Sequence, residues 1–78
     1  MSLTADHLIL FLKDTLRLDG DVTSDSPLFT SGALDSVAMM NLIAFVEERA
    51  AIQVRADQVT LENFDTAGRI VAFASAAA

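Results

Sequence analysis

The sequence predicts a small all-α domain: a bundle of three main helices and one short helix, with a long loop between the first and second helices. Three observations support this. Apolar residues recur at helical spacing in three segments, and residues that cap helix N-termini precede these segments. The chain has 78 residues, enough for one domain, which we expect to span residues 1–78.

The first helix is predicted to begin near Ser2 or Thr4, either of which can cap it. Its apolar residues are three or four positions apart and therefore share one face. They are Ala5, Leu8, Ile9, Leu12 and Leu16, with Phe11 beside them. Lys13 and Arg17 lie toward the end of this helix, where the helix dipole favours positive charge.

A long connection, residues 18–34, follows the first helix and contains turn-forming residues such as Ser26-Pro27. Long loops in small domains are commonly pinned to the core. The apolar residues expected to pin this one are Val22, Leu28, Phe29 and Leu34. Gly32 permits the backbone conformation that turns the chain into the next helix.

The second helix is predicted to run from Ser36 to about Ala50, with Asp35 as its N-cap. The inward residues are Met39, Leu42, Ile43 and Val46, flanked by Phe45. The outward residues are Val37, Met40, Asn41, Ala44, Glu47 and Glu48. Several outward residues are apolar, which fits either a docking surface or a helix that the bundle buries on nearly all sides.

The last third of the chain is predicted to hold two single helical turns and a final helix. The turns fall at residues 56–59 and 60–64, with Thr60 capping the second. Asp65 is expected to cap the final helix, residues 66–76. Its apolar face comprises Ala67, Ile70, Val71, Phe73 and Ala74. Gly68 costs this helix roughly 1 kcal/mol relative to alanine, so we expect a close approach to a neighbouring helix there.

The composition excludes several kinds of site. The chain has no cysteine and one histidine, so we expect no disulfide and no metal centre. A net charge of −6 argues against nucleic acid, whose binding proteins need basic surfaces. The longest apolar run is too short to span a membrane, and no signal segment opens the chain. We therefore expect a soluble, cytoplasmic protein without membrane insertion.

Ser36 is the residue of greatest chemical interest. It stands at a predicted helix N-terminus, where unpaired N–H groups and a partial positive charge suit a phosphate. Asp-Ser is also common there as a simple cap, so both a modified serine and an ordinary cap fit the residues alone. A hydrolase using Ser36 with the lone histidine, His7, has no orienting acid in the pattern. We predict no catalytic residue.

The run Gly32-Ala33-Leu34-Asp35-Ser36-Val37 resembles the acyl carrier protein superfamily. So do Ser26-Pro27-Leu28-Phe29 upstream and Leu61-Glu62-Asn63-Phe64-Asp65-Thr66 downstream. The chain is most similar to free-standing aminoacyl and D-alanyl carrier proteins and to peptidyl carrier domains. The resemblance implies that Ser36, beside Asp35, carries a 4′-phosphopantetheine arm whose thiol holds an acyl or aminoacyl group as a thioester.

The resemblance also implies the partners. A phosphopantetheinyl transferase would move the arm from coenzyme A to Ser36, using Mg²⁺ that the transferase binds and this chain does not. An adenylate-forming acyl or amino-acid ligase would load the thiol. A downstream acyltransferase or synthase would receive the cargo. The chain would then be a carrier and not an enzyme, and most simply a monomer.

The sequence departs from fatty-acid carriers, which usually continue Asp-Ser-Leu and place acids on the outward face of the second helix. Here Val37 replaces the leucine, and Ala38 and Asn41 stand where acids are common. The expected docking residues are Val37, Met40, Asn41, Ala44, Glu47 and Glu48. The apolar members Val37, Met40 and Ala44 favour a dedicated partner that reads an apolar surface, and hence an amino-acid-type carrier.

The alternative function is a non-enzymatic helical interaction module without a prosthetic group. In that case the second helix would bind its partner directly, and Ser36 would only cap the helix.

Overall fold

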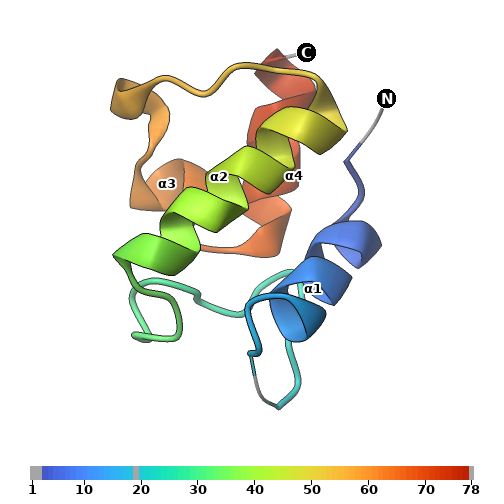
Figure 1. Ribbon diagram of the computed structural model, residues 1–78, viewed down its shortest axis with the longest axis vertical. Helices are drawn as coiled ribbons and strands as arrows, with labels where there is room; N and C mark the ends of the chain where they lie inside the picture. Colours follow the sequence, from blue (N-terminus) through green and yellow to red (C-terminus); the bar gives the residue numbers. More distant parts are fainter. Residues whose placement is uncertain (1–2, 19, 78) are drawn as a thin grey trace.

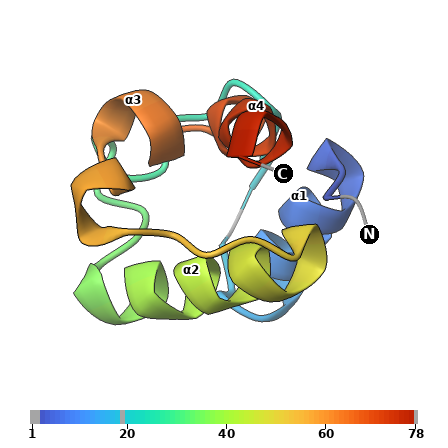
Figure 2. The same cartoon turned by 90° about the horizontal axis from the view of Figure 1, so that it is seen from above.

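The computed structural model describes residues 3–18 and 20–77, and this part of the chain is an all-α bundle (Figure 1). Its elements are α1 (Ala5–Asp14), α2 (Ser36–Ala50), the 3-10 turn η1 (Ala56–Gln58), α3 (Leu61–Phe64) and α4 (Ala67–Ala77). Helix α4 contacts the other three helices, and Figure 2 shows it end-on opposite α2. Three main helices, one short helix and a long first loop confirm the predicted fold.

Local caps fix where three of the helices begin. Thr4, Asp35 and Thr60 each accept a hydrogen bond from the backbone N–H three residues further on, at 3.2, 2.9 and 3.3 Å. Such bonds satisfy N–H groups that have no partner inside the helix. The predicted caps of α2 and α3 are confirmed, and Thr4 is the cap of α1; Ser2 lies outside the described residues.

Helix α1 ends before the apolar pattern predicts. Its last residue is Asp14, and Leu16 lies beyond it. The N–H of Leu18 donates to the carbonyl of Leu12 at 3.1 Å, and Arg17 has a left-handed φ of 61°. The left-handed backbone at Arg17 turns the chain back after the helix, so that Leu18 packs against the core. The prediction that Arg17 belongs to the end of the helix was therefore wrong.

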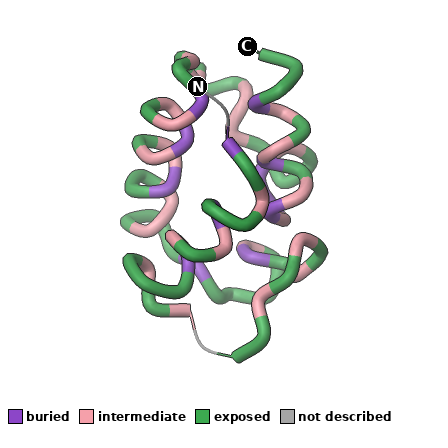
Figure 3. The backbone as a smooth tube through the Cα atoms, turned by 90° about the vertical axis from the view of Figure 1, so that its right-hand side faces the viewer, coloured by how far each residue is buried: buried purple, intermediate pink, exposed green. Residues whose placement is uncertain are grey.

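The core lies between the helices, where the buried positions of the tube face inward (Figure 3). The helices contribute Leu8, Leu12, Leu42, Val46, Ala50, Phe64, Ala67, Ile70 and Ala74, and the first loop contributes Leu28 and Leu34. Stacked rings of Phe11 and Phe45, with centroids 4.0 Å apart, join α1 to α2. The apolar faces predicted for the three main helices are thus the ones that pack.

Asp65 corrects the sequence prediction, because it does not cap α4. Its carboxylate instead accepts hydrogen bonds from the N–H of Phe29 (2.9 Å), the N–H of Thr30 (3.1 Å) and the hydroxyl of Thr30 (3.0 Å). Its carbonyl accepts from the N–H of Leu28 at 2.7 Å. The capping bond of α4 comes from Thr66, whose Oγ1 accepts the N–H of Arg69. Asp65 therefore ties the first loop to the α3–α4 junction.

Gly68 does approach a neighbour closely, but that neighbour is the first loop and not a helix as predicted. Its N–H donates to the carbonyl of Ser24 at 2.9 Å. A Cβ added at Gly68 would lie 3.2 Å from the same carbonyl oxygen. The missing side chain thus allows α4 to hold the loop through its backbone.

Replacing Gly68 with alanine should lower the Tm, although alanine favours an isolated helix by about 1 kcal/mol. The new methyl group would push against Ser24 and weaken the bond that holds the loop. Thermal unfolding followed by circular dichroism measures the effect, with Ser75→Ala as the matched control on an exposed position of α4. The control should raise the Tm slightly; an equal rise in Gly68→Ala would contradict the tight contact.

Candidate functional site

Ser36 is the first residue of α2, and its side chain is exposed. Asp35 caps the helix through Ala38. In the described part of the chain, the N–H groups of Ser36 and Val37 have no hydrogen-bond partner. The helix dipole adds partial positive charge at this end, so the position fits a phosphodiester on the serine oxygen.

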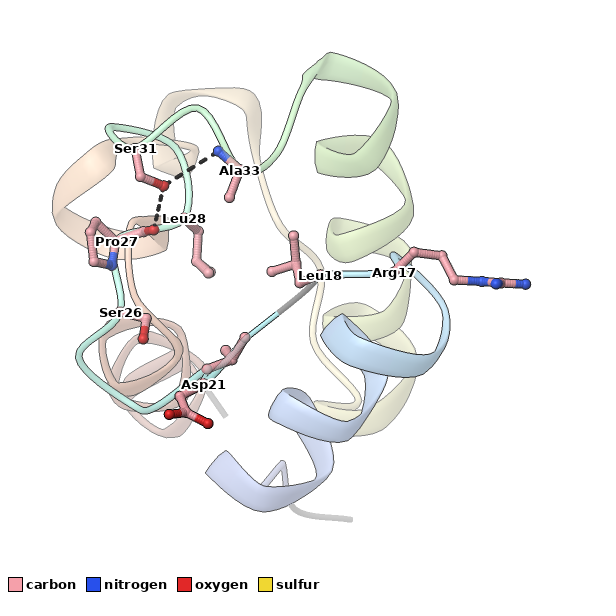
Figure 4. A pocket seen from close by; sticks show the side chains of 9 residues that line it. Arg17, Leu18, Asp21, Ser26, Pro27, Leu28, Ser31 and Ala33 are labelled. Atoms are coloured by element: carbon pink, nitrogen blue, oxygen red, sulfur yellow. Dashed lines mark hydrogen bonds between the residues drawn. The ribbon is translucent and has the colours of Figure 1, made fainter.

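The loop before Ser36 is held in place by its own hydrogen bonds. Gly32 has a φ of 79°, which a glycine adopts without strain, and its N–H donates to the carbonyl of Phe29. The hydroxyl of Ser31 donates to the carbonyl of Pro27 (2.7 Å) and accepts from the N–H of Ala33 (3.3 Å), as Figure 4 shows. Together with the Asp65 tie, these bonds fix the approach to α2.

A depression of about 310 Å³ adjoins Ser36, lined by Phe29, Leu34, Asp35, Ser36 and Met39. Phe29 and Leu34 come from the loop, and Met39 lies one turn into α2. Predicted as an inward residue, Met39 is half-buried and contributes to this wall. Three of the five residues are apolar, and Asp35 supplies the charge.

A larger cavity, of about 410 Å³, opens under the same loop (Figure 4). Its lining residues include Leu18, Leu28 and Ala33 but neither Asp35 nor Ser36. The side chain of Arg17, although at its edge, points away from the other lining residues. This cavity is therefore separate from the serine site.

The predicted docking residues are exposed, with one exception. Val37 and Met40 are 68% and 71% exposed, and Asn41, Ala44 and Glu48 are exposed as well. The bundle therefore leaves the outward face of α2 uncovered. Glu47 is the exception: it is half-buried, and its Oε2 accepts the N–H of Val54 at 2.8 Å.

Leu61 is an exposed apolar residue that the sequence interpretation did not single out. It begins α3 and is 51% exposed. The four-residue helix is too short for its apolar spacing to indicate which face is outward, so the sequence held no signal for it.

His7 lies far from Ser36, which excludes the pair as a hydrolase centre. Its Nδ1 lies 3.1 Å from the guanidinium of Arg49, which can only donate. Arg49 and Ser36 stand at opposite ends of α2, about 20 Å apart at the rise of an α-helix. A general base must reach the nucleophile within hydrogen-bond distance or through one water.

The family model described as the phosphopantetheine attachment site matches residues 6–74, nearly the whole chain. The chain belongs to this family. It is a carrier protein whose prosthetic group is 4′-phosphopantetheine, and it delivers thioester-linked acyl groups. Carrier proteins are substrates of a phosphopantetheinyl transferase and of acyl-handling enzymes, and are not themselves catalysts.

No curated protein and no solved structure matches this carrier protein. Among the described helices of the carrier, none combines the length and the apolar character that crossing a membrane requires.

Replacing Asp35 with alanine should destabilise the carrier by about 1 kcal/mol through loss of the N-cap. If the arm is attached at Ser36, the change should also slow loading, because the first turn of α2, which begins at Ser36, would fray. Urea unfolding and the initial rate of phosphopantetheine transfer measure the two effects. Thr60→Ala is the matched control, since it removes the cap of α3: it should lower stability without slowing the transfer. Equal slowing in both variants would contradict a local role for Asp35.

Proposed function

We propose that Ser36 is the residue that carries the arm. The observation that carries this proposal is the exposed Ser36 hydroxyl at the N-terminus of α2, beyond a loop that hydrogen bonds hold in place. The arm supplies a thiol that holds the cargo as a thioester. Ser36 anchors it, Asp35 holds the first turn, and the free N–H groups favour the phosphodiester.

Three other serines of the described chain are less suitable. The hydroxyl of Ser31 donates to Pro27, and that of Ser26 accepts the N–H of Thr23 at 2.9 Å. Ser75 lies inside α4, where neighbouring N–H groups already have partners within the helix. Ser36 combines exposure with a helix N-terminus.

We further propose that the cargo is an amino acid that stays outside the bundle. Leu42, Val46, Phe64 and Ile70 have no accessible surface, so no void large enough for water touches them. A buried acyl chain would have to displace this packing between α2 and α4. An aminoacyl thioester carries a charged ammonium group, for which burial would be unfavourable, so it needs no such cavity.

The partner surface proposed for this carrier is the exposed apolar face of α2. Val37 and Met40 flank Ser36 on the outward side, and the first turn of the helix contains no acid. Because the carboxylate of Glu47 binds the backbone of Val54, Glu48 is the acid of α2 that stays free for a partner. An adenylate-forming amino-acid ligase with an apolar contact surface fits this face, and the cytoplasm, where coenzyme A is available, is the proposed location.

Changing Met40 to glutamate should lower kcat/KM for loading by a phosphopantetheinyl transferase about tenfold or more, since an apolar anchor near the centre of an interface commonly contributes this much. Leu10→Glu is the matched control: it places the same charge on a residue of α1 that is 57% exposed. The control should load normally. Equal rates for both variants would rule out Met40 as a docking residue.

Mass spectrometry of the intact protein tests the attachment. The carrier should gain the mass of 4′-phosphopantetheine on incubation with coenzyme A, Mg²⁺ and a broad-specificity transferase. Peptide mapping should place that mass on Ser36. Protein purified from its own source should carry a further mass that identifies the cargo. A modification on another serine would overturn the site, and a long-chain acyl mass would overturn the amino-acid proposal.

A further inference from the structure

The depression beside Ser36 has a wall that exists before any group is attached. Phe29 is held by two bonds: its N–H donates to Asp65 Oδ1 and its carbonyl accepts the N–H of Gly32. Leu34 is buried, and its N–H donates to the carbonyl of Leu28 at 3.0 Å. A surface fixed in this way binds a ligand without the entropy cost of ordering the loop.

The chemistry of the depression matches the first segment of the arm. In 4′-phosphopantetheine, a methylene group follows the phosphate, and then come a carbon that bears two methyl groups, a carbon that bears a hydroxyl, and an amide. Phe29, Leu34 and Met39 offer apolar surface to the methyl groups, and burying such groups is favourable. Asp35 Oδ1 is occupied by Ala38, which leaves Oδ2 to accept the adjacent hydroxyl.

We propose that the dimethyl segment of the arm rests in the depression formed by Phe29, Leu34 and Met39. This inference rests on the attachment of the arm to Ser36. The depression lies on the loop side of Ser36, whereas Val37 and Met40 are exposed on the outward face of α2. A resting arm therefore leaves the partner surface free. The distal thiol and its cargo extend beyond the depression into solvent.

The test uses the full chain loaded with an arm that carries ¹³C, made from coenzyme A labelled in its pantothenate part. Mass mapping of the same sample first establishes whether the arm is on Ser36. Isotope-filtered NMR should then show nuclear Overhauser contacts from the two arm methyl groups to the ring of Phe29 and the methyl of Met39. Contacts to Val37 and Met40 alone, or none in a sample loaded on Ser36, would overturn the resting site. Loading elsewhere would instead overturn the attachment proposal.

Three variants distinguish the contact between the Phe29 ring and the arm from a general effect on the fold. The ring of Phe29 should shift the NMR signals of nearby arm methyl groups upfield. Phe29→Leu keeps an apolar side chain on the loop but removes the ring, so this upfield shift should disappear while the backbone spectrum stays that of a folded protein. Met39→Gln should weaken the same contacts from the helix side. Phe11→Leu is the matched control, because Phe11 is a half-buried ring between α1 and α2. Arm signals that respond equally to the control would overturn the assignment.

Discussion

Ser36→Ala should show no mass gain under conditions that load the wild-type carrier completely. The transferase forms the phosphodiester on a hydroxyl oxygen, and alanine offers none. Alanine also suits the first turn of a helix, so the variant should stay folded with an unchanged circular dichroism spectrum. The effect is therefore expected to be a total loss of loading, measured by intact mass over a time course long enough to load the wild type many times over.

Two further serine variants make this result specific. Ser31→Ala removes an exposed hydroxyl from the same loop, together with its bonds to Pro27 and Ala33, and should still load. Ser36→Thr retains a hydroxyl but adds a methyl group beside it, so it should load more slowly than the wild type. Full loading of Ser36→Ala would show that the arm is attached elsewhere.

Asp65→Asn should have the second largest effect, a clear fall in Tm at neutral pH. The carboxylate accepts three hydrogen bonds from Phe29 and Thr30. The amide oxygen of asparagine can still accept the two N–H groups, but it is neutral, so these hydrogen bonds are weaker than those to a carboxylate. Its NH₂ group would replace the oxygen that accepts the Thr30 hydroxyl, so this hydroxyl could then only accept. Amide hydrogen exchange should rise at Phe29 and Thr30, because the loop before Ser36 loses its tie.

The same contact makes stability depend on pH. The N–H groups of Thr30 and Phe29 lower the pKa of Asp65 below its usual value, and they outweigh the opposing effect of burial. A carboxyl group with a lowered pKa in the folded state stabilises the fold fully above its unfolded pKa of about 4. That contribution is lost as the pH falls through the folded pKa. Asp65→Asn should therefore have a Tm that varies less with pH below about 4.

Asp57→Asn is the matched control for this prediction. Asp57 pairs with Arg55 at 3.2 Å on the surface, where its side chain is 72% exposed. Exposed pairs contribute little to stability, so this variant should unfold almost as the wild type does at neutral pH. A similar fall in Tm for both variants would mean that charge loss alone, and not the loop tie, is responsible.

The sequence alone was enough to predict the features that depend on residues close to one another in the chain. Thr4, Asp35 and Thr60 cap helices through an N–H three residues away, and such a relation is visible in the chain itself. The inward positions Leu42 and Val46 follow from helical spacing. For the same reason the fold class, and the position of Ser36 at the start of α2, follow from the order of the residues alone.

The sequence alone was not enough to predict a contact where a side chain can bind either a near neighbour in the chain or a residue far from it. Asp65 and Thr66 can both cap a helix, and the distant loop at Phe29 determined which of them does. Gly68 indicated a close contact in the last helix, but the sequence did not show that this contact is with Ser24. Glu47 was predicted to face outward, but its carboxylate accepts a hydrogen bond from the N–H of Val54, in the segment that follows α2. Each outcome depends on contacts that periodicity does not encode.

The bond between Phe29 and Asp65 also has a consequence for biosynthesis. These residues are 36 positions apart, and a ribosome adds residues at about 5–20 per second, so Asp65 is made about 2–7 s after Phe29. For most of that interval the nascent chain already contains Ser36 but cannot form the tie that holds its loop. A transferase that modifies Ser36 and requires the finished loop would therefore act only after Asp65 has emerged, and arm attachment would then follow synthesis of the α3–α4 junction.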